Sequence, residues 1–147
     1  MGSIMLALAA ARVEPNLRLN HALDWALHKR WVGISIHERG ELAAALAGSC
    51  GSTALPAELL ALTDERKLHR ALAWGLATRL CRRLNAGSHD LRANCRLVRS
   101  DEALTLEVHP GIAALVNDSA RSDLAALASW NGLEDRVVIG EFSDPWE

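Results

Sequence analysis

The segment from Thr63 to Gly87 constrains the fold most, because it has the pattern of one long amphipathic helix. Leucine recurs every four residues at positions 68, 72, 76, 80 and 84, and Ala73, Ala77 and Cys81 lie on the same side. This spacing matches the 3.6-residue period of an α-helix. Thr63 is expected as the N-cap, and the residues around Gly87 as the left-handed exit. The sequence therefore predicts a helix whose leucine face is buried in a core.

The same helix carries an unusual number of positive charges. Its six cations are Arg66, Lys67, Arg70, Arg79, Arg82 and Arg83. Arg79 and Arg82 are three residues apart, hence on one side, next to the small residues Gly75 and Thr78. Because arginine binds phosphate oxygens in a two-pronged way, we expect a strip here along which a linear anion approaches the backbone. The alternative is a solvated face with ordinary salt bridges.

Charge is distributed unevenly along the chain. Residues 64–99 hold nine Lys/Arg against three Asp/Glu, a balance of +6, whereas residues 100–147 hold two against ten, a balance of −8. This asymmetry favours a basic surface for an anion and an acidic end that faces a basic partner or repels nonspecific polyanions. The alternative is that the two blocks face each other.

The pattern of elements predicts a mainly α protein of the α+β class. Of the 147 residues, 50% are hydrophobic, which is enough for a real core. Helices are expected over residues 4–12, 16–30, 38–47 and 56–62, before the long basic helix. Two short strands follow at 94–99 and 103–109, then a short helix from Pro110, a helix over 118–130 and a third strand at 136–139. We therefore expect a helical domain over residues 1–90 and a small β-β-α-α unit over 91–147.

Cysteine usage and hydropathy indicate a cytoplasmic protein. The chain has three cysteines, an odd number, and no C-x-x-C pair: Cys50, Cys81 and Cys95. This is expected for free thiols in a reducing compartment. The apolar opening IMLALAAA is too short to span a membrane and has no basic leader. We expect no membrane partner.

Two histidine patterns bear on metal binding. His21 and His28 are seven residues apart on one helix, with Asp24 between them, so their imidazoles are separated by about 10.5 Å, too far for one ion. His89-Asp90 matches the dipeptide of HD-type metal-dependent phosphohydrolases, but no second histidine and aspartate with the required order accompany it. No phosphate-binding loop or nucleophile motif is present either. We expect no catalytic residue, no metal ligand and no cofactor in this chain.

Three stretches in order resemble one family. They are HALDWALHKRWVGISIHERGELAAAL (21–46), LTDERKLHRALAWGLATRLCRRLNAG (62–87) and CRLVRSDEALTLEVHPGIAALVNDSARSDLAALASWNGLE (95–134). Together they resemble the C-terminal portion of the exopolyphosphatase / guanosine-pentaphosphate phosphohydrolase (Ppx/GppA) family. The resemblance implies an N-terminally truncated HD-like helical domain followed by a small C-terminal unit. In that family the catalytic groups and Mg²⁺ reside in N-terminal actin/Hsp70-like lobes, which this chain lacks.

The resemblance implies an accessory role in binding polyphosphate and in forming a homodimer. The N-terminal lobes are expected as a further partner, and no specific nucleic acid is expected to bind. The polyphosphate-binding positions implied by the family pattern are His37, Arg39, Arg79, Arg82 and Arg83. Two alternatives remain open: a standalone HD-type metal-dependent phosphohydrolase, and a pure dimerisation module that uses Trp25, Trp31 and Trp74.

Overall fold

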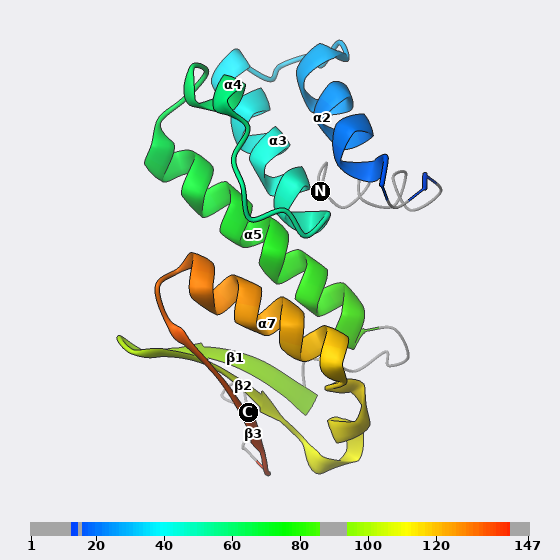
Figure 1. Ribbon diagram of the computed structural model, residues 1–147, viewed down its shortest axis with the longest axis vertical. Coiled ribbons are helices and arrows are strands. Elements are labelled where there is room, and N and C mark those ends of the chain that lie inside the picture. The colour runs from blue at the N-terminus through cyan, green and yellow to red at the C-terminus, as the bar shows by residue number, and fades with distance from the viewer. Residues whose placement is uncertain (1–12, 15, 86–93, 142–147) are drawn as a thin grey trace. The chain divides into compact units, whose positions relative to one another are not determined.

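The computed structural model describes residues 13–14, 16–85 and 94–141, and in it the chain forms two compact units (Figure 1). One unit ends at Arg79 and the other begins at Leu80. The division therefore falls inside a helix, earlier in the chain than the expected boundary at residues 90/91. The segment around that expected boundary and the helix expected over residues 4–12 lie outside the described residues.

The first unit is helical. It contains α2 (Arg18–His28), α3 (Ile36–Ser49), α4 (Ala57–Leu60) and most of α5 (Glu65–Leu84). Its core combines alanines from α2 and α3 with leucines from α3, α4 and α5. The fully or almost fully buried side chains are Ala22, Ala26, Ala43, Ala44, Leu46, Ala47, Leu59, Leu68, Leu72 and Leu76. Alanine on two of the helices allows close packing, and each buried leucine stabilises the unit by about 2 kcal/mol.

Helix α3 begins two residues before the predicted start at Glu38, because a capping box fixes its first turn. The side chain of Ser35 accepts a hydrogen bond from the backbone N–H of Glu38, and Glu38 Oε2 accepts one from the backbone N–H of Ser35 at 2.7 Å. This reciprocal pair satisfies two N–H groups that a helix start leaves without partners. The backbone N–H of Ser35 and its hydroxyl, which donates to the same Oε2 at 2.7 Å, hold the pKa of the Glu38 carboxyl below its ordinary value.

Helix α5 confirms the leucine pattern and corrects two details. All five leucines at positions 68, 72, 76, 80 and 84 are at most 3% exposed. The N-cap is Asp64 rather than Thr63, since Asp64 Oδ1 accepts from the backbone N–H of Arg66 at 2.8 Å. Cys81, predicted on the apolar side, is exposed.

Helices α3 and α5 cross in close backbone contact at two glycines. A Cβ atom on Gly48 would lie 2.9 Å from the backbone nitrogen of Leu76, and one on Gly75 would lie 2.8 Å from that of Ser49. Real Cβ atoms do not approach backbone this closely, so only glycine fits at either position. The glycines therefore set the distance between the two helices.

The second unit contains a three-stranded mixed sheet, covered by a helix. Strands β1 (Cys95–Arg99) and β2 (Ala103–Val108) pair antiparallel, with Leu97 opposite Leu106. Strand β3 (Glu134–Ile139) lies parallel to β2, with Val137 opposite Leu106. A parallel pair needs a crossover connection, which the 3₁₀ helix η1 (Pro110–Leu115) and α7 (Asp118–Trp130) provide. Helix α7 packs on β2 and β3 (Figure 1).

The chain thus has the mainly helical α+β class predicted from sequence: four helices, then a small mixed sheet with a helix among the described elements. The third strand is confirmed, although it starts at Glu134, two residues before the predicted position. Within the described residues, no helix is both long enough and apolar enough to cross a membrane.

Candidate functional site

Arg79, one of the five predicted polyphosphate ligands, closes the C-terminal end of α3. Its Nη1 donates a hydrogen bond to the carbonyl oxygen of Cys50 at 3.0 Å, and its guanidinium lies over Gly51. Cys50 is the C-cap of α3, where helix carbonyls have no intrahelical partner and the helix dipole is negative. The cation at this position is therefore engaged in the fold of the first unit.

Arg39 and His37 make contacts of the same kind. Arg39 Nη1 donates to the carbonyl oxygen of Leu27, in the last turn of α2, at 3.2 Å. His37 Nδ1 forms a hydrogen bond with the carbonyl oxygen of Leu62, two residues after α4 ends. Both side chains connect the start of α3 to the end of another helix.

Arg83 and Arg82, in the second unit, have different surroundings. Arg83 Nε donates to Asp123 Oδ2 on α7 at 2.6 Å, and the Asp123 side chain is only 8% exposed. Arg82 is exposed to solvent. The alternative in which the basic and acidic blocks face each other therefore applies at Arg83. Arg82 is the predicted ligand most open to a polyanion.

The predicted strip for a linear anion beside Gly75 is not open. Gly75 is buried, and the backbone of α3 from Ala45 to Ser49 occupies the space next to it. Thr78, the other small residue of the strip, donates its hydroxyl hydrogen to the carbonyl oxygen of Trp74 at 2.8 Å. The small side chain at position 75 serves helix packing, which corrects the sequence-based interpretation.

The histidine patterns do not converge on a metal site in the described residues. His28 Nδ1 lies 3.2 Å from Asp24 Oδ1, whereas the His21 ring packs against Trp25 at 5.7 Å between centroids. The described part of the chain brings together no group of three His, Cys, Asp or Glu side chains suited to a metal ion. His89 and Asp90 lie outside it.

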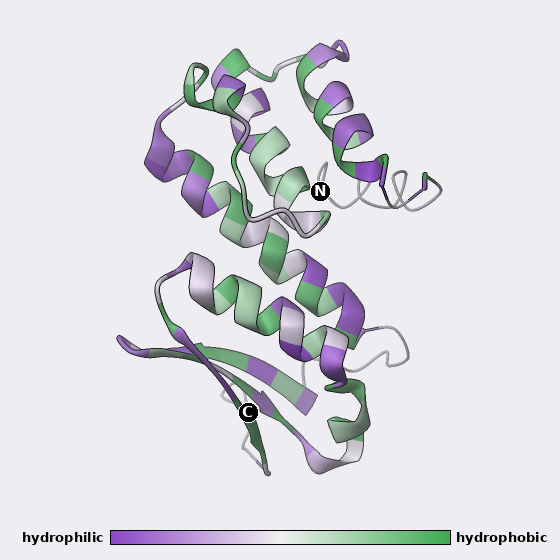
Figure 2. Cartoon of the chain, in the orientation of Figure 1, coloured by the Kyte–Doolittle hydropathy of each residue, from purple (hydrophilic) through white to green (hydrophobic). Residues whose placement is uncertain are grey.

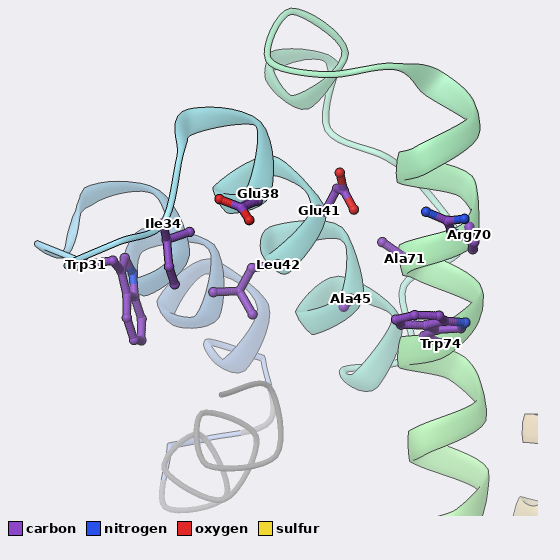
Figure 3. Close-up of a pocket in the computed structure, with 9 residues that line it drawn as sticks. All are labelled: Trp31, Ile34, Glu38, Glu41, Leu42, Ala45, Arg70, Ala71 and Trp74. Atoms are coloured by element: carbon purple, nitrogen blue, oxygen red, sulfur yellow. The ribbon is translucent and has the colours of Figure 1, made fainter. Parts of the chain in front are cut away.

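A pocket of about 330 Å³ lies between α3 and α5 in the first unit (Figure 3). We call it the α3–α5 pocket. Its lining residues come from the connection before α3 and from one side of each of the two helices: Trp31, Ile34, Glu38, Glu41, Leu42, Ala45, Arg70, Ala71 and Trp74. Figure 3 shows Trp31 and Trp74 at opposite ends of the pocket, with Leu42 and Ala45 between them. Its lining is therefore mainly apolar, with charged groups on both helices.

Charges of opposite sign lie on the two helices that form the pocket. Glu38 and Glu41 belong to α3, whereas Lys67 and Arg70 belong to α5. Lys67 Nζ lies 3.9 Å from Glu41 Oε1, the long end of the range for an ion pair, and the Arg70 guanidinium lies 5.9 Å from the ring centroid of Trp74. The Trp74 side chain is 67% exposed.

Sequence reasoning named Trp31 and Trp74 as interaction residues but did not predict the pocket. The carboxylates at positions 38 and 41 have helical spacing, and so do the cations at 67 and 70. What the sequence does not show is that α3 and α5 lie side by side, which brings these two pairs together.

No model of a known protein family matches this chain, and a search of curated proteins finds no sequence similar to it. The resemblance to the Ppx/GppA family therefore stays a prediction.

Proposed function

We propose that this chain is an accessory, noncatalytic region of an exopolyphosphatase-like hydrolase, in which it helps to bind polyphosphate and to dimerise the enzyme. The first unit corresponds to the HD-like helical domain of that family, and the second to its small C-terminal unit. Catalysis and its Mg²⁺ belong to N-terminal lobes outside this chain. The absence of any disulfide among its three cysteines is in keeping with a place in the cytoplasm.

The observation that carries the polyphosphate part is the exposed positive charge at both ends of α5. Figure 2 shows hydrophilic residues gathered at the two ends of this helix. Arg66, Lys67 and Arg70 are exposed in the first two turns, within the first unit, and Arg82 is exposed in the second. Exposed guanidinium groups bind phosphate oxygens through charge-assisted hydrogen bonds.

Among the five residues implied by the resemblance, Arg82 has the direct role in binding, because its side chain is exposed. His37, Arg39 and Arg79 donate to or share a hydrogen bond with backbone carbonyl groups, and Arg83 is paired with Asp123. These four side chains would have to leave their partners to reach a polyanion. We therefore expect them to contribute less to binding than the exposed cations do.

The test is a titration of the chain with fluorescently labelled polyphosphate at low and at moderate salt. Each neutralised phosphate releases counterions, so the affinity should fall steeply as salt rises. Arg66→Ala and Arg82→Ala should each weaken binding by about threefold to tenfold at low salt and reduce the salt dependence. The matched control is Arg99→Ala, which removes an exposed arginine from β1 rather than from α5. Absence of binding at low salt, or equal losses in the variants and the control, would reject the polyphosphate part.

The α3–α5 pocket favours a second candidate function, that of a protein interaction module. Large aromatic side chains that stand exposed beside an apolar depression are common at protein interfaces. Trp74 meets this description at 67% exposed. Sedimentation of the chain at several concentrations separates this candidate from a simple polyanion binder, and both functions are compatible with one molecule.

A further inference from the structure

The α3–α5 pocket has an arrangement of charge that is complementary to itself. On α3, Glu38, Glu41, Leu42 and Ala45 are spaced three or four residues apart and therefore lie on one side of the helix. On α5, Lys67, Arg70 and Trp74 are related in the same way. An acidic edge and a basic edge thus flank one apolar strip.

Glu38 is engaged in the capping box with Ser35, whereas the described contacts of Glu41, Lys67 and Arg70 include no strong ion pair. Among the described residues, the ion pair between the two edges joins Lys67 to Glu41 at 3.9 Å, with the Lys67 side chain 54% exposed and that of Glu41 30% exposed. At this separation and exposure the pair contributes little to stability. Both charges therefore remain available to a group of opposite sign on a docked partner.

We propose that the α3–α5 pocket is the surface through which two copies of this chain associate. A two-fold axis along the pocket places α3 of one copy over α5 of the other, because such a rotation exchanges the two edges. Glu41 of each copy then faces Lys67 and Arg70 of its partner, and the apolar strips meet between them. This inference rests on the dimerisation part of the proposed function and names the face involved; it makes no use of polyphosphate binding.

The apolar strip supplies the affinity in this interface, and the charges supply the orientation. Trp74 is the residue with the largest exposed apolar surface in the strip, and buried tryptophans are frequent hot spots of binding energy. Charge pairs at an interface contribute mainly by excluding wrong arrangements, since like charges that face each other are repelled. A two-fold axis perpendicular to the helices would instead place α3 of one copy over α3 of the other, and the carboxylates of α3 would repel each other. The charges therefore favour the axis that runs along the pocket.

A charge-reversal experiment tests both the face and the axis. One variant carries Glu41→Lys, and the other carries Lys67→Glu with Arg70→Glu. Each alone places like charges opposite each other and should be monomeric by sedimentation velocity at concentrations where the unchanged chain dimerises. An equimolar mixture should form heterodimers, because opposite charges face each other again at both edges. Trp74→Ala should weaken the unchanged dimer by about tenfold or more.

The controls separate the failure of this inference from that of the proposed function. Glu58→Lys makes the same charge change on the exposed surface of α4, away from the pocket, and should leave dimerisation unchanged. Circular dichroism verifies that every variant is folded. If the unchanged chain dimerises and the pocket variants dimerise equally well, the proposed face is wrong while dimerisation stands. If the unchanged chain is monomeric at all concentrations, the inference and the dimerisation part are both rejected, whatever the polyphosphate titration shows.

Discussion

Arg39 and Arg79 each place a guanidinium on a carbonyl oxygen at the C-terminal end of a helix. The acceptors are Leu27 on α2 and Cys50 at the end of α3. Such carbonyls carry partial negative charge and lack an intrahelical partner, so they attract the same cation that a phosphate oxygen attracts. An arginine therefore looks the same in the sequence whether its acceptor is a ligand or the end of a neighbouring helix.

At the residue scale, Arg79 and Arg82 form a matched pair for separating these roles. They lie on the same helix and are the same residue type, but Arg79 donates to Cys50 whereas Arg82 is exposed. Arg79→Ala should lower the free energy of unfolding by about 1 to 2 kcal/mol, because the α3 carbonyl loses a charged donor. Arg82→Ala should change it by less than about 0.5 kcal/mol. Urea denaturation followed by circular dichroism measures both, and equal effects would contradict the capping role of Arg79.

The limits of prediction from sequence follow from the same residues. The burial of the five leucines between Leu68 and Leu84 could be predicted from the sequence. Helical periodicity is a local pattern, so the partner helix need not be known. The acceptors of His37, Arg39, Arg79 and Arg83 lie between 12 and 40 residues away in the sequence. No local pattern identifies them. The α3–α5 pocket could not be predicted from the sequence for the same reason, since it depends on which two helices are neighbours.

At the element scale, the crossing of α3 and α5 depends on Gly48 and Gly75. Glycine has a low helix propensity, so both residues weaken their own helices. Because they lack a Cβ atom, the backbones of α3 and α5 approach more closely than any larger residue would permit. The close approach also fixes the separation of the two helices that line the α3–α5 pocket. The sequence pattern, which predicted an open strip at Gly75, is equally compatible with this use of a small residue.

Gly48→Ala should therefore destabilise the first unit although alanine favours helices. The added Cβ meets backbone atoms of α5, including the Leu76 nitrogen at 2.9 Å, so α3 and α5 must separate. We expect a net loss of about 2 to 3 kcal/mol after a propensity gain of about 1 kcal/mol. Gly40→Ala in the same helix is the control, because its Cβ would meet only the side chains of Thr63 and Leu62, at 3.3 and 3.4 Å. In thermal unfolding, the melting temperature should drop clearly for Gly48→Ala and not for Gly40→Ala. Similar melting temperatures for the two variants would refute the close crossing of α3 and α5.

At the scale of the whole molecule, one continuous helix belongs to both compact units. Leu68, Leu72 and Leu76 of α5 are buried in the core of the first unit. Residues from Leu80 onward belong to the second unit. In the second unit, the Arg83–Asp123 pair connects the last turn of α5 to α7. Proteins open in cooperative groups that follow such divisions of contacts. We therefore expect the two units to differ in local stability although they share a helix.

Arg83→Ala tests this division, because it acts within the second unit alone. Removing the guanidinium takes a charged hydrogen-bond donor at 2.6 Å from a carboxylate that is only 8% exposed, which should cost about 2 kcal/mol. Amide hydrogen exchange should become faster in α7, in the sheet and in the last turn of α5. In α3 and in α5 before Arg79 it should stay unchanged, because the Gly48–Gly75 crossing and the buried leucines hold that part of the helix. Arg82→Ala, one residue away and exposed, should alter exchange in neither unit. Faster exchange throughout the described residues of both units would mean instead that α5 makes them unfold as one.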